Sequence, residues 1–429
     1  MKTLNDFNIK PQKPWEVEGV EWREVRLKEL VEDVKSGFAL SKQKRIKINK
    51  DIGIPQLRPY NIANWNKIDL SELTFIPKNM NDVEEYFIKY GDVLFNNTNS
   101  IELVGRAAVF RNAGGSYTYS NHITRIRVKK QVITPDFLSW YLNFLWNKGF
   151  FYMKATKWIG QAGISNKKLL QIRIPIPFRN GKPDLETQKK IVEYIEANFS
   201  RIDKILEKKK KELEKLDELW ESVLEQAFKP REGEEWREVK LGDKAIAEII
   251  MGQSPPSSSY NKNGRGILFL QGNKEFGELY PKPIMYTTDP KKLCRKNDIL
   301  ISVRAPVGDV NIADGEYCIG RGLAAIRFNG EPKYLFYLLV SIKERIEELG
   351  RRGTTFKAIT KNHLKNLKIP LPFRNNQPDL EKQKEIANYL DNVYEKIKTT
   401  KEKIQRQITL LEEMKESILD EVFKHGETG

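Results

Sequence analysis

Arginine, asparagine and glutamine side chains, which can contact nucleic-acid bases, recur in the turn-rich stretches of this chain. An arginine can hold guanine through two hydrogen bonds, and an asparagine or glutamine can hold adenine in the same way, whereas lysine mostly contacts phosphate. Because asparagine and glutamine also stabilise turns, a purely local role is the alternative for any one of them. The candidates are Arg58, Asn61, Asn64, Asn97, Asn99 and Arg106 in the first half of the sequence, and Gln271, Asn273, Arg304 and Arg321 in the second half.

Catalytic motifs are incomplete. A nuclease holds magnesium between an aspartate and a Glu-x-Lys pair, and Asp184 with Glu207 and Lys209 formally matches that pattern. These residues fall on one predicted helix, whose rise would hold the two parts roughly 35 Å apart. The string SPPS at 254–257 lacks both ends of a methyltransferase box for a flipped adenine, and the sequence has no phosphate-binding Gly-Lys-Ser/Thr loop. We therefore predict that the chain has no catalytic residues and no metal ligands of its own.

An internal repeat frames these candidates. Residues 174–180 read IPIPFRN and residues 369–375 read IPLPFRN, and the string PDLE follows each of them. The string EWREV occurs at 21–25 and again at 235–239. A period of about half the chain is too long for a solenoid, so it predicts two homologous units, each made of a domain followed by a helix.

Each copy of the repeat ends in a long helix with coiled-coil periodicity. After Asp184 and after Asp379, apolar residues alternate in steps of three and four, the pattern with which two helices bury a common seam. Lys209 interrupts the first seam, and Lys401 and Lys415 interrupt the second. An aspartate at this position is also typical of a helix start. The seam residues predicted to pair the helices are Ile195, Phe199, Ile202, Leu206, Leu213, Leu216 and Trp220 in the first helix, and Leu390, Ile397, Ile404, Ile408, Leu411 and Ile418 in the second.

The predicted fold class is α+β, with two globular α/β domains separated by two long helices that form a coiled coil. Parallel pairing would place both domains at the same end of the coiled coil, whereas antiparallel pairing would place one at each end, related by a pseudo-two-fold axis. We predict the antiparallel arrangement because closed, self-complementary interfaces tend to have this symmetry. The expected segments are an N-terminal extension at 1–20, a first domain at 21–183, a first helix at 184–229, a second domain at 235–378 and a second helix at 379–424.

Composition limits the class of protein. A net charge of +16 with a pI near 9.4 favours a polyanionic partner, usually nucleic acid, although a thermophile-like surface rich in charges of both signs is the alternative. Two cysteines and three histidines are too few for a disulfide framework or a tetrahedral zinc site, which predicts a reducing, cytoplasmic setting. The longest apolar run, 334–340, is too short to cross a bilayer, and the polar N-terminus lacks a signal-peptide core.

The order domain, helix, domain, helix resembles the specificity (S) subunit of type I restriction-modification systems over nearly the whole chain. The most specific element of the resemblance is the Pro-Phe box that leads into LETQKKI at 185–191 and LEKQKEI at 380–386, each with one inserted residue. The string DILISVR at 298–304, followed by Val-Gly at 307–308, is similar to the family's recognition-domain phrase. The first half departs from that phrase at 96–98, as a domain that recognises a different sequence would.

The resemblance implies both partners and cofactors. Each target-recognition domain would read one half of a bipartite, asymmetric DNA site, while the helices would set the spacer and bind two methyltransferase (M) subunits, which restriction (R) subunits join. S-adenosylmethionine, ATP and magnesium would be used by those partners and not by this chain. One alternative is a coiled-coil scaffold whose two domains bind proteins without DNA sequence specificity. A standalone nuclease or methyltransferase is the other, and the missing motifs disfavour it.

Overall fold

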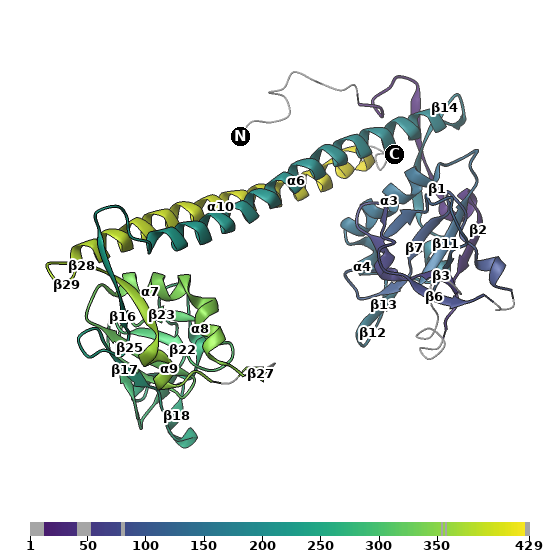
Figure 1. Ribbon diagram of the computed structural model, residues 1–429. Helices are drawn as coiled ribbons and strands as arrows, with labels where there is room; N and C mark the ends of the chain where they lie inside the picture. Colours follow the sequence, from purple (N-terminus) through teal and green to yellow (C-terminus); the bar gives the residue numbers. More distant parts are fainter. Residues whose placement is uncertain (1–12, 41–52, 79–81, 353–354, 357, 425–429) are drawn as a thin grey trace. The chain divides into compact units, whose positions relative to one another are not determined.

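The computed structural model describes residues 13–40, 53–78, 82–352, 355–356 and 358–424. The chain forms two compact units, which are coloured along the sequence in Figure 1. Unit 1 comprises Met1–Lys208 and Gln407–Gly429, and unit 2 comprises Lys209–Arg406. The division passes through both long helices, α6 (Leu185–Ala227) and α10 (Leu380–Phe423). Each unit therefore contains part of each helix, and not one complete helix as the repeat alone would suggest.

The repeated strings form a matching strand frame in the two units. Trp22 of the first EWREV string lies opposite Pro177 of the first Pro-Phe box, and Trp236 lies opposite Pro372 in the second unit. Both pairings are antiparallel, and a short hairpin strand then leads into the long helix. The frame consists of β1 (Val20–Arg26), β14 (Arg173–Arg179) and β15 (Lys182–Pro183) in unit 1, and of β16 (Glu235–Lys240), β28 (Lys368–Arg374) and β29 (Gln377–Pro378) in unit 2.

The start of each long helix is fixed by an aspartate. The backbone N–H of Thr187 donates to Asp184 Oδ1 at 3.0 Å, and Arg179 Nε donates to Asp184 Oδ2 at 2.9 Å. At the start of α10, Asp379 makes the same two kinds of interaction. The predicted helix starts are confirmed, and the ion pair explains why the arginine of the Pro-Phe box recurs together with the aspartate.

Unit 1 is built around two sheets and helix α3, which packs against β7 and β9. The four-stranded sheet has the order β2 (Val31–Ser36), β11 (Ile123–Val128), β7 (Val93–Asn96) and β9 (Ala107–Val109), and the three-stranded sheet has the order β10 (Thr118–Tyr119), β3 (Gly53–Leu57) and β6 (Thr74–Pro77). The remaining elements are α1 (Leu27–Leu30), β4 (Ile62–Ala63), β5 (Lys67–Ile68), β8 (Thr98–Asn99), α3 (Pro135–Asn147), α4 (Phe150–Lys154), β12 (Thr156–Trp158), β13 (Gln161–Gly163) and α5 (Asn166–Leu169).

Unit 2 repeats this plan, with helix α7 packed against β22 and β23. Its four-stranded sheet has the order β17 (Ala247–Met251), β25 (Leu323–Phe328), β22 (Ile299–Ser302) and β23 (Val310–Ile312). Its five-stranded sheet has the order β18 (Tyr260–Asn261), β20 (Met285–Thr287), β19 (Ile267–Leu270), β24 (Tyr317–Ile319) and β21 (Leu293–Cys294). The remaining elements are α7 (Pro332–Ser341), α8 (Lys343–Leu349), β26 (Arg351–Arg352), β27 (Thr355–Phe356) and α9 (Lys361–Asn366).

The long helices contribute side chains to the core of each unit. In unit 1 the ring of Phe423, from α10, packs against Phe137 and Tyr141 of α3 at centroid distances of 5.6 Å and 5.3 Å. In unit 2 the ring of Phe228, which follows α6, packs against Tyr334 of α7 at 5.3 Å. In each unit the globular domain is therefore joined to the long helices by buried aromatic contacts.

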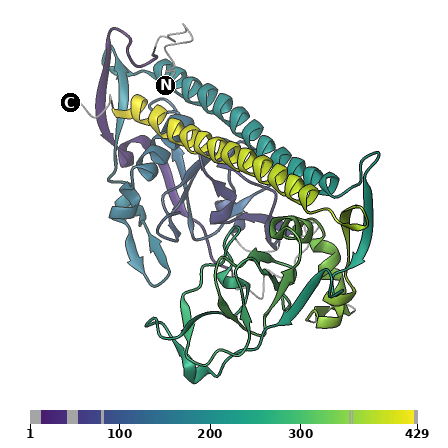
Figure 2. The same cartoon turned by 90° about the vertical axis from the view of Figure 1, so that its left-hand side faces the viewer.

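Helices α6 and α10 run antiparallel. In unit 1 Lys415 Nζ lies 2.6 Å from Asp203, and in unit 2 Lys401 forms an ion pair with Asp217. The step from Asp203 to Asp217 along α6 equals the step from Lys415 back to Lys401 along α10, so the register does not slip. The two helices lie side by side in both views (Figures 1 and 2). The antiparallel prediction is confirmed.

The predicted seam is buried to different depths. Ile195, Phe199, Ile202 and Leu206 join the core of unit 1 together with Ile418. The remaining seam residues are buried or half-buried as well, namely Leu213, Leu216, Trp220, Leu390, Ile397, Ile404, Ile408 and Leu411. The lysines that interrupt the heptad pattern remain in the interface because each has an ion-pair partner, and Lys415 is only 3% exposed.

Candidate nucleic-acid interface

Strand pairing in unit 2 gathers three loops at one edge. Strands β19 and β24 are parallel, so Gln271 and Arg321, which follow them, emerge at the same edge of the sheet. Strand β22 is antiparallel to β25, so the segment after β22, with Arg304, meets the start of β25. The N–H of Val303 donates to the carbonyl of Gly322 at 2.9 Å and closes this junction. The topology therefore brings together three of the four residues that the sequence singled out in this half.

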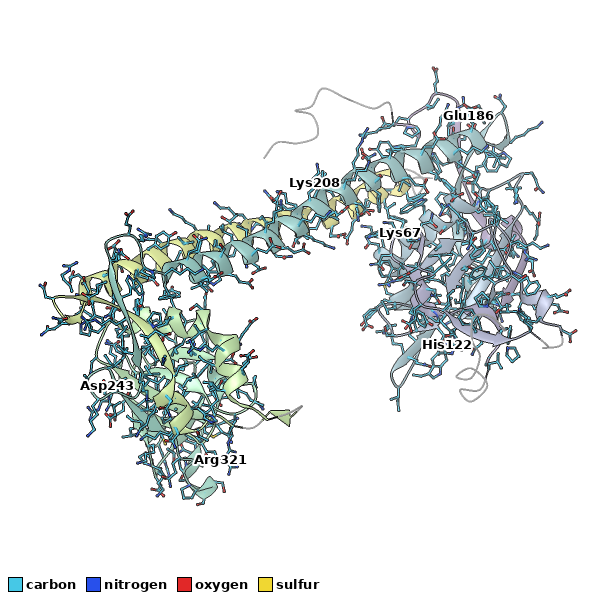
Figure 3. All side chains as sticks on the ribbon, viewed as in Figure 1. Lys67, His122, Glu186, Lys208, Asp243 and Arg321 are labelled. Carbon is cyan, nitrogen blue, oxygen red and sulfur yellow. The ribbon has the colours of Figure 1, made fainter. Side chains whose placement is uncertain are left out.

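These three side chains line an open pocket of about 390 Å³. All three are exposed, and the described part of the chain supplies neither guanidinium with an ion-pair partner. Arg321 lies at the end of unit 2 that is remote from α10 (Figure 3). Two arginines and an amide at a solvent-facing edge provide several hydrogen-bond donors for a polyanion or a base edge. The complete lining is Ser254, Pro255, Ser257, Tyr260, Gln271, Arg304, Arg321 and Gly322.

Part of this lining was not predicted as a site. The sequence offers the SPPS string at 254–257 only as an incomplete methyltransferase box, but Ser254, Pro255 and Ser257 lie at the pocket wall. Ser254 Oγ accepts a hydrogen bond from the backbone N–H of Arg321 at 3.2 Å. The irregular composition of this string, between two predicted strands, is the sequence feature that could have indicated a loop at the site. Its role is to hold the Arg321 loop.

Asn273 positions the loop that carries Arg304. Its Nδ2 donates to Asp309 Oδ2 at 2.6 Å, and the backbone N–H of Asp309 donates to Ser302 Oγ at 2.9 Å. The Ser302 hydroxyl in turn donates to the carbonyl of Pro306 at 2.9 Å. Asn273 is half-buried and its Nδ2 is bonded to the protein, so the structure shows it supporting the Arg304 loop, and its predicted contact with a base stays a prediction.

Unit 1 builds its equivalent edge with different side chains. Strands β3 and β10 are parallel, so Arg58 follows β3 at the edge where Asn121 follows β10. The N–H of Asn97 donates to the carbonyl of His122 at 3.0 Å, as Val303 does to Gly322 in unit 2. In Figure 3, His122 lies at the end of unit 1 remote from Glu186 of α6. Asn121 and His122 were not among the predicted site residues, although the similarity of HITRIR to GLAAIR could have identified them.

Two of the predicted base-contacting residues in unit 1 have structural roles instead. Asn61 is 1% exposed, its Oδ1 accepts from the N–H of Arg58 at 2.7 Å, and its Nδ2 donates to the carbonyls of Asp69 and Glu72, both at 2.8 Å. The Nδ2 of Asn97 is buried and donates to Thr124 Oγ1 at 2.9 Å. Each of these two amides is enclosed and holds the backbone of a turn, so neither is retained among the residues that we propose to contact bases.

Arg58 and Asn64 lie in different surroundings. Arg58 is at the predicted edge, but its side chain is only 9% exposed. Asn64 is exposed, in the turn between β4 and β5. The next residue, Trp65, packs against Phe199 of α6 at a centroid distance of 5.3 Å. The structure therefore places Asn64 on a hairpin that contacts the long helix, apart from the loops that follow β3, β7 and β10.

Asn99 and Arg106 are both half-buried. Asn99 lies on β8, the strand that directly follows the Asn97 turn, and its Oδ1 accepts from the N–H of Ser100 at 2.8 Å. The Arg106 guanidinium lies 4.7 Å from the centre of the Trp146 ring, and burial lowers the pKa of Arg106. Of these two residues, Asn99 stays with the candidate edge, whereas Arg106 packs on an aromatic ring.

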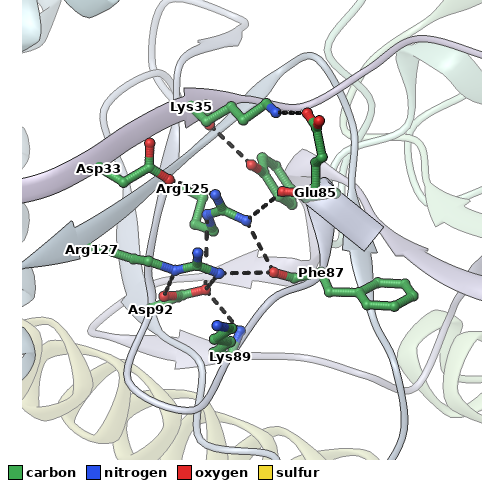
Figure 4. A network of polar contacts seen from close by, with 9 residues as sticks. Asp33, Lys35, Glu85, Phe87, Lys89, Asp92, Arg125 and Arg127 are labelled. Atoms are coloured by element: carbon green, nitrogen blue, oxygen red, sulfur yellow. Dashed lines mark hydrogen bonds and ion pairs between the residues drawn. The ribbon is translucent and has the colours of Figure 1, made fainter. Parts of the chain in front are cut away.

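A partly buried ion pair joins the same strands at the end opposite the candidate edge in both units. Arg127 donates to Asp92 through Nε at 2.9 Å and through Nη2 at 3.2 Å, and Arg327 holds Asp298 through the same two atoms. In unit 1 this pair belongs to the larger network in Figure 4, where Arg125 also donates to two backbone carbonyls. Bidentate pairs of this kind fix the strands behind the loops.

Comparisons with known proteins identify the family of this chain. The family model described as "Type I restriction modification DNA specificity domain" matches residues 19–215 and 233–410. The chain belongs to this family. The "Putative type I restriction enzyme MjaX specificity subunit" of Methanocaldococcus jannaschii is 37% identical to this specificity-domain chain in a 408-residue alignment, and the match covers 90% of this chain and 90% of that protein. The type I restriction enzyme MjaVIII specificity subunit of the same organism is 25% identical and covers 67% of this chain and 70% of its own length.

Solved structures agree with the fold of the specificity-domain chain. A chain from a study of complex assembly and conformational transition of the type I R-M system has a TM-score of 0.75 and 30% identity, and the match covers 95% of this chain and 98% of that one. The HsdS subunit of Thermoanaerobacter tengcongensis has a TM-score of 0.58 and 28% identity, with 95% and 97% covered. The fold class predicted from the sequence is confirmed.

The residues that formally match a nuclease motif lie far apart along one helix. Asp184 caps the start of α6, and Glu207 lies far along the same helix. Across the described ranges, no three His, Cys, Asp or Glu side chains are grouped closely enough to hold a metal ion. In the same part of the chain, no helix combines the length and apolar character needed to cross a bilayer.

Proposed function

We propose that this specificity-domain chain is the DNA-recognition subunit of a type I restriction-modification enzyme, and that each unit reads one half of a bipartite, asymmetric site. One observation carries the proposal. Equivalent strand ends converge at one edge of each unit, but they carry Gln271, Arg304 and Arg321 in unit 2 and Arg58 and Asn121 in unit 1. A shared frame with different side chains is what two different half-sites require.

The charge and the chemistry of the edges support double-stranded DNA as the ligand. The net charge of +16 supplies the positive field that favours a polyanion. In unit 2 the exposed guanidinium groups of Arg304 and Arg321 match guanine O6 and N7, and Gln271 can hold adenine. We infer that unit 2 reads a half-site through these three side chains, and that unit 1 reads the other through the loops that bear Arg58, Asn99 and Asn121.

We further propose that α6 and α10 set the spacer and dock two methyltransferase subunits. Several large apolar side chains on these helices are exposed although the seam is closed, including Ile205, Leu219, Tyr389, Leu410 and Met414. Leu219 and Met414 occupy equivalent positions in the repeat, 36 residues after the PDLE strings begin at 183 and 378. An exposed apolar position that recurs in both helices, as Leu219 and Met414 do, suits two copies of one partner.

The chemistry would belong to the partners. Methyl transfer from S-adenosylmethionine would take place in the methyltransferase subunits, and ATP hydrolysis and magnesium-dependent cleavage in restriction subunits that join the complex. The role of this chain in each reaction is to hold the correct DNA sequence in place. No group on its recognition edges is proposed to exchange a proton or to form a covalent bond.

The test is to co-express the chain with the methyltransferase subunit encoded beside it, purify the complex and map the methylated adenines on a random DNA library. The proposal predicts a stable complex and a split motif made of two unrelated halves separated by unspecified bases. A complex that neither forms nor methylates a motif would favour the coiled-coil scaffold. Methylation or cleavage by the chain alone would overturn its assignment as a non-catalytic subunit.

A further inference from the structure

The hairpin of β12 and β13 presents an apolar tip to solvent. Trp158 is 58% exposed, and the side chain of Ile159 is fully exposed. Gly160 completes the turn at a φ of +74°, a backbone conformation that favours glycine. Tyr152 and Met153, on the neighbouring helix α4, are also exposed. The other tryptophans of the chain are buried or half-buried, so an exposed apolar cluster at the end of a hairpin indicates a contact surface.

The hairpin is attached directly to the recognition edge of unit 1. Strand β13 pairs with β8, so that Ala162 lies opposite Asn99. The N–H of Ile164 donates to the carbonyl of Asn97 at 2.8 Å. The hairpin therefore continues the same sheet that carries the candidate base-contacting segment. Whatever binds at Asn99 is within reach of the hairpin tip.

The tryptophan is held in place before any ligand binds. A Cβ atom built on Gly163 would lie 2.9 Å from the Trp158 ring, so the indole rests against the bare backbone of that glycine. One side of the ring is thereby supported by the hairpin, and the rest of the side chain remains exposed. An aromatic ring supported in this way is a preformed stacking surface.

Lysines surround the apolar tip. Lys168 Nζ donates to the carbonyl of Lys154 at 2.9 Å and to Thr156 Oγ1 at 3.1 Å, which braces the hairpin against α4 and α5. Lys157 Nζ lies 4.3 Å from the centre of the Tyr152 ring. Apolar side chains flanked by lysines are the composition of a wedge that enters a base step while its cations contact the adjacent phosphates. The positive charge favours DNA over an apolar protein surface as the occupant.

We propose that the β12–β13 tip is a DNA wedge that inserts Ile159 into a base step at the edge of the first half-site and stacks Trp158 on an unstacked base. This inference rests on the proposed function of unit 1. It is specific to that unit, because residues 351–354 read RRGT where residues 156–159 read TKWI. The wedge therefore predicts a local DNA distortion at one half-site only.

The test uses the full chain in complex with its methyltransferase subunits and begins with the methylation motif of the wild-type complex. DNA duplexes containing this motif then carry 2-aminopurine at successive positions in and beside the first half-site, excluding the methylated adenine. Insertion of Ile159 should unstack one step and raise the fluorescence at that position. Ile159→Ala should abolish the rise and weaken DNA binding about tenfold, while the motif is retained. Trp158→Ala tests the stacking surface in the same duplexes.

The matched control is Tyr90→Ala, which removes an exposed aromatic side chain, 63% exposed, just before β7, at the end of that strand opposite the Asn97 turn. It should leave the fluorescence at the first half-site and the affinity for DNA unchanged. Ile159→Ala complexes that keep both the fluorescence rise and the affinity would overturn the wedge. Weaker assembly with the methyltransferase, combined with normal DNA binding of the assembled complex, would overturn it in favour of a protein-docking surface. A wild-type complex without any motif would overturn the proposed function together with the wedge.

Discussion

An arginine that contacts a base and an arginine that contacts a phosphate differ in what their removal changes. Replacing Arg304 or Arg321 with alanine removes a guanidinium from the pocket without touching its supporting hydrogen bonds, because Arg321 bonds to Ser254 through its backbone. We expect each variant to relax the second half of the methylated motif, with a loss of about 1–3 kcal/mol at the base concerned, and to leave the first half unchanged.

The control for this experiment is Arg345→Ala, which removes an exposed arginine from α8 of the same unit. It should leave both halves of the motif unchanged. A uniform loss of methylation across all sequences in Arg304→Ala or Arg321→Ala would show that these arginines contact phosphates. The readout for every variant is the same library-based map of methylated adenines.

A buried amide should behave in the opposite way. Asn61→Ala would leave the N–H of Arg58 and two backbone carbonyls without their partner, at a cost of about 1–3 kcal/mol of folding free energy. We expect thermal unfolding of unit 1 at a lower temperature, measured by calorimetry, and an unchanged methylation motif. A changed first half-site in a fully folded variant would restore Asn61 to the base-contacting set.

Side-chain type alone could not separate these two roles. The exposure of Arg304 and Arg321 was predictable, because each adjoins a recognisable strand end and short loops at such ends are exposed. The burial of Asn61 depends on the carbonyls of Asp69 and Glu72, which only the folded turn brings near it. No periodic pattern in the sequence indicates hydrogen bonds of this kind. Tertiary structure therefore decides whether a given amide is available to contact a base or instead stabilises a turn.

At the scale of the elements, two ion pairs of unequal burial set the register of α6 and α10. Burial opposes ionisation of Asp203, but hydrogen bonds from Lys415 and Lys67 outweigh it, so the pKa of Asp203 lies below its usual value. The Lys415 ammonium also lies 5.6 Å from the centre of the Phe199 ring. The Asp217–Lys401 pair is much more open to solvent.

We therefore expect Lys415→Ala to destabilise unit 1 by about 2 kcal/mol, which lowers its unfolding temperature by several degrees, because it leaves a partly buried carboxylate with one cation fewer. Lys401→Ala is the matched variant in the same helix, and its effect should stay within about 0.5 kcal/mol. Equal effects of the two substitutions in calorimetry would contradict the importance of the buried pair.

A third ion pair attaches the start of strand β16 to the start of α10. Glu234 accepts from Lys382 at 2.9 Å and from Trp236 Nε1 at 3.0 Å, and the hydrogen bond from Lys382 lowers the pKa of Glu234 from 4.5 to about 2. A carboxylate whose pKa is lower in the folded state stabilises the fold fully above the unfolded-state pKa. That contribution disappears as the pH falls towards the folded-state pKa.

Glu234→Gln should therefore reduce the free energy of unfolding of unit 2 at neutral pH, by at most about 1 kcal/mol because the pair is partly open to water, and so lower its unfolding temperature. The difference from the wild-type chain should shrink between about pH 4.5 and pH 2, where the wild-type carboxylate becomes protonated. Calorimetry of both proteins across this range checks the prediction. A difference that is constant with pH would mean that shape, and not charge, is what the glutamate contributes.

The elements themselves were the most predictable part of the chain. The heptad pattern and the aspartates at 184 and 379 predicted both long helices, because coiled-coil burial and capping act through local spacing. The β12–β13 hairpin was not predicted, since its strands are short and its tip is apolar, unlike a typical turn. Its position beside Asn99 follows from pairing with β8, which the sequence does not encode as a pattern.

At the scale of the whole molecule, each recognition unit contains part of both long helices. The boundary between the two units passes through α6 after Lys208 and through α10 after Arg406. The aromatic contacts of Phe423 and Phe228 join the globular domain of each unit to the long helices. A change in helix length should therefore be transmitted to the recognition edges and not absorbed by a linker. This supports the proposal that the helix pair acts as a ruler for the spacer between the half-sites.

The ruler can be lengthened without disturbing its seam. Residues 202–208 of α6 face residues 410–416 of α10 in the register set by Asp203 and Lys415. Duplicating both segments adds one heptad to each helix and repeats the buried ion pair. At about 1.5 Å per residue the helix pair grows by about 10 Å, which corresponds to about three base pairs at 3.4 Å each.

The most direct measurement is the methylation motif of this lengthened chain, mapped beside that of the wild-type chain on the same random library with the same methyltransferase subunit. The account predicts a split motif for both proteins, with identical half-sites and a spacer about three base pairs longer in the lengthened chain. Half-sites that change, or a spacer that stays the same, would contradict the assignment of recognition to the two units and of spacing to the helices.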